Sequence, residues 1–308
     1  MNNNQFTKSF WFANVWSFFS EFTVEDLEVN YLKWRAYRQS FAKMHHHPAQ
    51  LNEMLDPVCL EMLPTDLTGI IISFHYGPYR LIPRYLLAAG YKISVLASPS
   101  IIQKERKETE HLLKFNNLEA DSLRYIDASR RTVLKNIVSD LNEKRLVLVY
   151  LDADEGVDRL AAKKARSLLK VPVAASQLYF HVSIVQLAFR FHIPLSFLLM
   201  EKNGTNGRWR LALSKKLGCK RGEQPDEFMK RFKRKLNTTV DRIVMKEWTA
   251  WENWPLIHFY HPDLAQAQVA SRNTSAWMMP ICTQQRAFLF DAKNRIYYEL
   301  KKANLPKE

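Results

Sequence analysis

Apolar runs rich in branched residues recur through the middle of the chain, and they constrain the fold more than any other feature. The first, LTGIIISFH at residues 67–75, is continuously hydrophobic, which is typical of a strand buried on both faces. Similar runs follow at residues 91–98, 122–126, 145–154, 193–201 and 208–214. Segments with helical character separate most of them, at residues 78–90, 103–115, 129–144 and 176–189. This alternation predicts an α/β fold with a mostly parallel central sheet flanked by helices.

Helical extensions are expected on both sides of this core. Residues 24–47 carry aromatic side chains at spacings of three and four, and residues 223–247 have the pattern of a long basic helix. The GTNG segment between the last two apolar runs predicts a hairpin turn. We therefore predict a helical region over 1–66, a single α/β domain over 67–260 and a C-terminal extension over 261–308.

Composition excludes several classes of protein. Glycine accounts for 8 of 308 residues, and neither GxxxxGK[ST] nor GxGxxG occurs, which argues against a nucleotide fold built on a glycine loop. Cys59, Cys219 and Cys282 lie far apart, so we predict no disulfide framework, no metal site and a reducing cytoplasm. The 47% share of hydrophobic residues is too high for a disordered chain.

The aromatic stretch FWFANVWSFFSEF at residues 10–22 bears on membrane association. It is too short to span a bilayer and lacks the pattern of a signal peptide. Its Trp and Phe side chains leave two interpretations open: a helix lying on a membrane surface, or a helix packed on the domain. The scarcity of Lys and Arg favours packing. We expect a cytoplasmic protein, with peripheral attachment to the inner membrane as the open alternative.

The formal net charge of +14 points to an acidic partner. Basic residues gather at 163–170 and at 215–235. Such a surface can steer an acidic carrier protein, contact anionic lipid headgroups, or simply be a solvated face. We predict no nucleic-acid partner, because the sequence carries no recognisable motif for binding one.

Two predicted strands end in residues suited to chemistry. His75 ends the first run, in FHYGPYR, and Asp152 ends another, in VYLDADEG. Sites in open α/β sheets gather at the carboxyl ends of strands, where a histidine can act as a general base or simply cap a buried strand. The helix expected to begin at Gly77 and Pro78 would direct free backbone N–H groups to the same place, which suits an anion or an oxyanion.

These motifs, in their order and spacing, resemble the bacterial lipid A biosynthesis acyltransferase family of the lysophospholipid acyltransferase-like superfamily. The motifs are FHYGPYR, LVLVYLDADEG and the stretch from LLKVPVAASQLYFHVSIVQ to RWRLALS, within residues 68–214. The resemblance implies a glycerolipid acyltransferase-like fold. It also implies acyl transfer from a thioester of acyl carrier protein or coenzyme A to an amine or hydroxyl, with His75 as general base. That thioester is a co-substrate, and no other cofactor is expected.

The sequence departs from this family at one decisive position. The family has Asp or Glu five residues after the histidine, whereas this chain has Arg80. Arginine cannot accept the imidazole N–H, and its charge disfavours the imidazolium that the reaction forms. Asp152 or Asp154 can supply the missing acid if their strand lies beside that of His75. Arg80 itself suits a carboxylate or phosphate, on the acceptor or on a phosphopantetheine arm, or a structural ion pair.

We therefore predict an acyltransferase of a specialised secondary-metabolite or lipid pathway. The predicted catalytic residues are His75, Asp152 and Asp154, and the predicted substrate-binding residues are Tyr76, Gly77, Tyr79, Arg80 and Ser176. Two alternatives stay open. One is a non-catalytic acyltransferase-like binding protein that has lost the dyad, and the other is a membrane-surface protein. A carboxylate oxygen within hydrogen-bonding reach of the His75 ring would favour catalysis.

Overall fold

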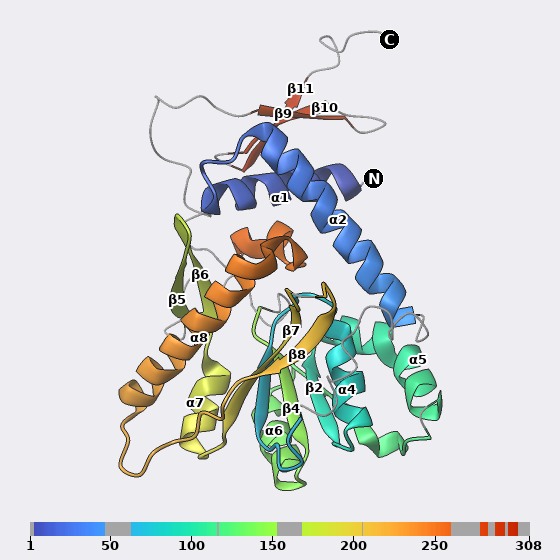
Figure 1. Cartoon of the computed structure of the whole chain (residues 1–308), viewed down its shortest axis with the longest axis vertical. Coiled ribbons are helices and arrows are strands. Elements are labelled where there is room, and N and C mark those ends of the chain that lie inside the picture. The colour runs from blue at the N-terminus through green and yellow to red at the C-terminus, as the bar shows by residue number, and fades with distance from the viewer. Residues whose placement is uncertain are drawn as a thin grey trace.

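A six-stranded sheet forms the centre of the molecule, with the strand order β3-β2-β4-β1-β7-β8 (Figure 1). The computed structural model describes residues 3–46, 63–115, 117–152, 168–204, 206–259, 278–282, 287–292 and 295–300. Five strands are parallel: β1 (Ile70–Ser73), β2 (Ile93–Ala97), β3 (Leu123–Asp127), β4 (Leu146–Tyr150) and β7 (Leu195–Lys202). The edge strand β8 (Trp209–Leu213) pairs antiparallel with β7, as the predicted hairpin requires. The mostly parallel α/β sheet is thus confirmed.

Strand β1 lies in the interior of the sheet, between β4 and β7. Its residues Ile70, Ile71 and Ile72 have no exposed surface, which explains why the run carries no polar alternation. Just before the strand, Gly69 has a φ of +93°, and a Cβ there would lie 2.2 Å from the carbonyl oxygen of Pro194. The chain therefore needs glycine where it enters the sheet beside β7.

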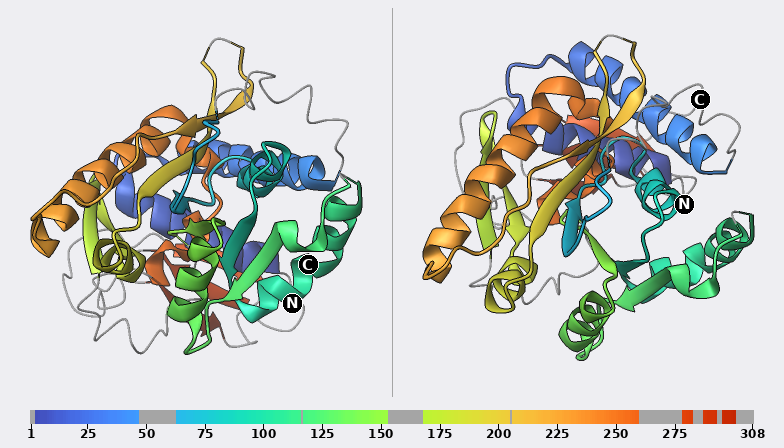
Figure 2. Two further views of the ribbon diagram at one scale, coloured as in Figure 1. Left: turned by 90° about the horizontal axis from the view of Figure 1, so that it is seen from below. Right: turned by 60° about the horizontal axis from the view of Figure 1, so that its bottom comes forward.

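Helices flank the sheet, and most of them match the predicted segments. They are α4 (Ile82–Ala88), α5 (Pro99–Phe115), α6 (Val133–Asn142), α7 (Ser183–Arg190) and α8 (Pro225–Glu247). Helix α4 contacts β2, α5 contacts β3, α6 contacts β3 and β4, and α8 contacts β7. In both views of Figure 2, α8 and α5 lie at opposite ends of the row of strands.

Two predicted helices differ from the structure. Helix α4 begins at Ile82, after the 3-10 turn η3 (Tyr79–Leu81), because Pro83 fits only the first turn of a helix. The helix predicted over 176–189 is wrong in its first half, where β6 (Ser176–His181) pairs antiparallel with β5 (Leu168–Val173). A short apolar run fits a strand as well as a helix, and only its pairing partner decides between them.

The aromatic N-terminus packs on the domain. Helix α1 (Asn3–Phe18) contacts η7 (Trp254–Phe259), and α2 (Val24–His46) contacts η6 (Trp248–Ala250). Trp11 and Phe18 have no exposed surface, and the Trp11 ring stacks on Trp248 with centroids 6.0 Å apart. The interpretation of a packed helix is therefore correct. None of the described helices combines the length and apolar character needed to cross a membrane.

Part of the C-terminal extension forms a small antiparallel sheet, which the sequence did not indicate. Its strands are β9 (Met278–Cys282), β10 (Ala287–Asp291) and β11 (Ile296–Leu300). Figure 1 shows this sheet beyond α1, at the end of the molecule away from the central sheet. Arg295, directly before β11, connects this sheet to α1. It donates hydrogen bonds to the side chain of Asn14 and the carbonyl of Ala13, both at 3.2 Å.

Candidate active site

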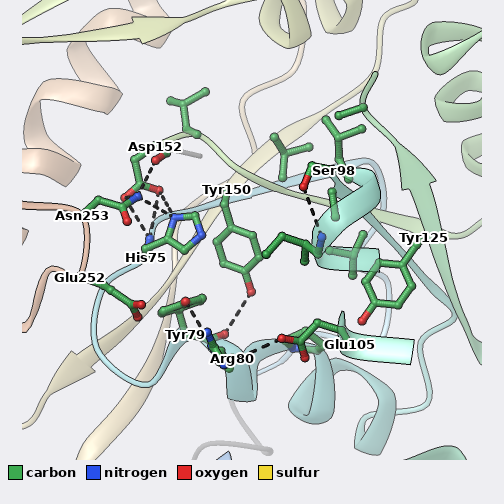
Figure 3. A pocket seen from close by; sticks show the side chains of 18 of the residues that line it. His75, Tyr79, Arg80, Ser98, Glu105, Tyr125, Tyr150, Asp152, Glu252 and Asn253 are labelled. Carbon is green, nitrogen blue, oxygen red and sulfur yellow. Dashed lines mark hydrogen bonds and ion pairs between the residues drawn. The ribbon is translucent and has the colours of Figure 1, made fainter. Parts of the chain in front are cut away.

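The pairing of β1 with β4 brings His75 and Asp152 together. Ser73 lies opposite Tyr150 in this parallel register, and each functional residue follows its strand by two positions. Oδ1 of Asp152 is 2.9 Å from Nδ1 of His75 (Figure 3). The carboxylate also accepts the backbone N–H of His75, with distances of 3.0 and 3.1 Å to its two oxygens. A carboxylate oxygen of Asp152 therefore lies within hydrogen-bonding reach of the His75 ring, while Asp154 lies outside the described residues.

A segment from 100 residues further along the chain completes the pair. In this 248–254 segment, the indole N–H of Trp251 donates to Oδ2 of Asp152 at 2.6 Å. The side-chain amide of Asn253 donates to the carbonyl of Asp152 at 2.6 Å, and the backbone N–H of Glu252 donates to the carbonyl of His75 at 2.8 Å. Sequence reasoning missed Trp251 and Asn253. The only sequence signal was the density of tryptophan and polar residues after the basic helix.

These contacts fix the tautomer of His75. An ionised carboxylate only accepts hydrogen bonds, so Nδ1 of His75 carries the hydrogen and donates it to Oδ1 of Asp152. The amide nitrogen of Asn253 lies 3.1 Å from the same Nδ1, and it donates its hydrogens to the carbonyl and to Oδ2 of Asp152, at 2.6 and 3.4 Å. No residue in the described part of the chain forms a hydrogen bond with Nε2. The ring therefore presents a lone pair, and 20% of its side chain is exposed.

The surroundings also set the basicity of His75. Burial is the largest single influence and lowers its pKa, but the charge and the hydrogen bond of Asp152 together raise the pKa above its ordinary value. Glu252 acts in the same direction, and Arg80 opposes it. Since the Asp152 side chain is only 4% exposed, its charge is poorly screened by water and acts strongly on the ring.

His75 and Asp152 belong to the wall of a cavity of about 630 Å³. This volume lies within the range of about 300–1,000 Å³ typical of small-molecule sites. Figure 3 shows Tyr150 between His75 and Tyr125, with Ser98 further along the wall. Apolar side chains from β2, α5, α6 and β6 form much of the remaining lining: Val95, Leu112, Val133, Ile137, Leu178 and Phe180. The cavity thus joins a polar pair to an apolar chamber.

Two of the predicted substrate-binding residues line this cavity beside His75. The ring of Tyr79 meets the His75 ring edge-on with centroids 4.7 Å apart, and its hydroxyl accepts a hydrogen bond from Nε of Arg80 at 3.2 Å. On the same wall, Tyr150 lies 4.9 Å from the His75 ring and donates its O–H to the carbonyl of Tyr79. Tyr79 and Arg80 are therefore within the candidate site.

The other three predicted substrate-binding residues do not line the cavity. Tyr76 is buried against Trp209, with ring centroids 5.9 Å apart. Gly77 has a φ of +60°, and a Cβ there would lie 2.6 Å from the Trp209 ring, so its role is one of close packing. Ser176 begins β6, in the β5–β6 hairpin.

The anion site expected at the start of the helix after His75 is not formed as predicted. The N–H of Gly77 donates to the carbonyl of Ala250 at 3.1 Å, and the N–H of Tyr79 donates to the carbonyl of Gly77 at 2.8 Å. Pro78 has no N–H, and α4 begins only at Ile82. These backbone N–H groups are engaged in local hydrogen bonds and are not directed into the cavity as an anion site would require.

The described residues of the two basic clusters, 168–170 and 215–235, do not line the cavity. Residues 163–167 of the first cluster are outside the described part of the chain, and no residue from 215 to 247 lines the cavity.

No protein-family model matches this chain, and no curated protein matches its sequence. The geometry of the site is that of a histidine whose Nδ1 lies 2.9 Å from a buried carboxylate.

Proposed function

We propose that this protein is an acyltransferase that moves an acyl group from a carrier-protein or coenzyme A thioester to an amine or a hydroxyl. The observation that carries the proposal is the His75–Asp152 pair, with Nε2 directed away from Asp152 on the wall of a largely apolar cavity. The resemblance in motif order supports the same chemistry. Asp152 would then replace, from the neighbouring strand, the acid that the family has five residues after the histidine.

The reaction follows from the roles of these two residues. Nε2 of His75 takes the proton from the acceptor hydroxyl or amine while the acceptor attacks the thioester carbonyl. Asp152 holds the ring and stabilises the imidazolium that forms. Collapse of the tetrahedral intermediate breaks the carbon–sulfur bond, and the proton on Nε2 passes to the departing thiolate. The products are an ester or amide and the free thiol of the carrier.

The apolar part of the cavity is the place for the acyl chain. Residues of β2, α5 and α6 supply this surface, including Leu112, Val133 and Ile137. Burying a methylene group contributes about 0.8 kcal/mol, so a chain of several carbons in this chamber gains substantial binding free energy. We therefore expect kcat/KM to rise with the length of the donor chain until the chamber is full.

The test is transfer from acyl-coenzyme A and acyl carrier protein thioesters to a panel of amines and alcohols. Products are identified by mass spectrometry, and the released thiol is measured in parallel. We expect His75→Ala to lower kcat/KM about 10³-fold. His111→Gln is the matched control, because His111 is exposed on α5 and does not line the cavity. Equal turnover by His75→Ala and the wild type would overturn the mechanism. Tight thioester binding without transfer would instead support a non-catalytic acyl-binding protein.

A further inference from the structure

Arg80 stands beside the His75–Asp152 pair on the cavity wall. Tyr79 lies between the two side chains: its ring is 4.7 Å from the His75 ring and 5.8 Å from Cζ of Arg80. Figure 3 shows the imidazole and the guanidinium on the same side of the cavity, with Tyr79 next to both. A small molecule whose reacting group faces His75 is therefore close to the Arg80 cation.

The guanidinium is held in place with its outer donors available. Its Nε donates to the Tyr79 hydroxyl at 3.2 Å, which fixes the plane of the group. The nearest carboxylate oxygen among the described residues belongs to Glu105 and lies 3.9 Å from Nη1, too far for a hydrogen bond. The Arg80 side chain is 32% exposed. A planar fork of this kind is suited to a carboxylate or a phosphate.

The cavity wall around Arg80 carries both acids and cations. Besides Asp152, which is engaged with His75, the charged lining residues are three glutamates and four cations: Glu105, Glu108, Glu252, Arg38, Arg80, Arg84 and Lys104. Glu252 has a cation of its own, because its Oε1 is 3.5 Å from Nη2 of Arg38. Glu105 and Glu108 both act electrostatically on Arg84. With Asp152 included, the four acids and four cations of this wall balance in formal charge. Glu252 and Glu105 also act electrostatically on Arg80, but the hydrogen-bond partner of its guanidinium in the described part of the chain is Tyr79, so the Nη donors are left for a bound anion.

We infer that Arg80 binds an anionic group of the acceptor, so that the acceptor is a small amine or alcohol that also carries a carboxylate or phosphate. This inference rests on the proposed acyl transfer. The nucleophile faces Nε2 of His75 while the anion engages the Arg80 fork, which places the two groups a few bonds apart. An amino acid and a phosphorylated alcohol both have this form.

Binding such an anion would also help the reaction. The charge of Arg80 acts to lower the pKa of His75 and thus opposes formation of the imidazolium. A carboxylate or phosphate on Arg80 neutralises this opposition at the moment when His75 takes up the proton. The arginine that replaces the family's acid then couples recognition of the acceptor to activation of the base.

The test uses acceptor pairs that differ in charge: glycine with glycinamide, leucine with leucinamide, and glycerol 3-phosphate with glycerol. The kcat/KM of each is measured for the wild type, Arg80→Gln and Arg80→Lys. We expect Arg80→Gln to lower kcat/KM about 100-fold for a charged acceptor, with a change below about threefold for its neutral partner. Arg80→Lys should fall between. Arg106→Gln is the control, because Arg106 is exposed on α5 and does not line the cavity.

Two kinetic outcomes would overturn the inference. One is an equal loss by Arg80→Gln with charged and neutral acceptors. The other is a loss that depends on the donor phosphate, which appears when an acyl-phosphopantetheine donor is compared with an acyl-pantetheine donor. In that case Arg80 binds the phosphate of the donor arm and not an anion of the acceptor.

A calorimetric measurement without donor separates this inference from the proposed function. Glycine, leucine and glycerol 3-phosphate are titrated into the wild type and Arg80→Gln. Binding that requires Arg80, with no transfer to any acceptor, would overturn the acyltransferase and support the anion site. Transfer without any dependence on Arg80 would overturn the anion site and support the acyltransferase. Absence of both binding and transfer would overturn both.

Discussion

Two sites with buried charged groups lie at opposite ends of the parallel strands, and they differ in how many of their polar atoms form hydrogen bonds. Arg145 precedes β4 at the amino end of the strand, and its side chain has no exposed surface. Its nitrogens donate to Oγ of Ser94 and to the carbonyls of Ile93, Asp121 and Ser122, with a further contact to the Asp121 carboxylate. These five contacts match the five N–H donors of a guanidinium.

The His75–Asp152 pair lies at the carboxyl end of the same strands. Here the carboxylate is satisfied by the N–H groups of His75 and Trp251, but Nε2 of His75 has no hydrogen-bond partner among the described residues. That nitrogen belongs to a cavity wall, whereas Arg145 lines no part of the cavity. A buried charged group whose donors all form hydrogen bonds stabilises the packing of the strands. A group that keeps an atom without a hydrogen bond on a cavity wall is a candidate for chemistry.

The sharpest test of this contrast is Asp152→Asn. The carboxamide has one acceptor oxygen where the carboxylate has two, so the ring loses its fixed tautomer and the imidazolium loses its counter-charge. We expect kcat to fall about 10⁴-fold, equivalent to about 5 kcal/mol. Asp140→Asn is the matched control, because Asp140 is buried beside Arg124 and does not line the cavity. A loss below tenfold would show that Asp152 does not orient the base.

Substitution of Arg145, at the amino ends of the strands, should lower the stability of the protein and leave its activity unchanged. Replacing Arg145 by Met leaves several carbonyl oxygens and the Asp121 carboxylate without their donor. We expect the free energy of unfolding to fall by about 3 kcal/mol, measured by urea denaturation. The activity per folded molecule should stay within twofold of the wild type. Arg145→Lys keeps the charge and should lose less. A large loss of activity in the folded variant would contradict a purely structural role of Arg145.

A smaller effect is expected when one donor to Asp152 is removed. Trp251→Phe keeps an aromatic side chain but removes the N–H that Oδ2 accepts, together with part of the volume of the indole, and we expect kcat to fall about tenfold. Trp254→Phe is a close control: Trp254 is equally buried, but its indole N–H donates to the carbonyl of Trp248, outside the pair. Equal losses of activity in the two variants would mean that Trp251 acts through packing alone.

The smallest expected effect is a shift of the pH profile. A general base must be neutral, so kcat/KM falls as the pH drops through the pKa of His75. This pKa is raised above its usual 6.5, chiefly because Asp152 outweighs burial, so the acidic limb should lie above pH 6.5. In Asp152→Asn, burial acts unopposed by that charge, and the residual activity should have its acidic limb at lower pH. A limb that does not move would exclude Asp152 as the cause.

Local pattern was enough to place the strands and their ends. The continuous apolar runs predicted β1, β2, β4 and β7. Parallel strands buried on both faces carry hydrophobic residues without polar alternation, which makes them easy to recognise in a sequence. The same runs ended at His75 and Asp152, and the tendency of sites to gather at carboxyl ends singled these residues out. The apolar run at β6 fits a helix as well as a strand, and only its antiparallel pairing with β5 makes it a strand.

The sequence by itself determined the α/β architecture and the two reactive strand ends, because hydrophobic periodicity is written locally along the chain. Only the tertiary structure decided that β1 and β4 are neighbours with Ser73 opposite Tyr150, which turns two separate strand ends into one pair. It alone also brought Trp251 and Asn253 onto that pair from a distant segment. Contacts between residues so far apart depend on how the elements pack, and no spacing in the sequence encodes them.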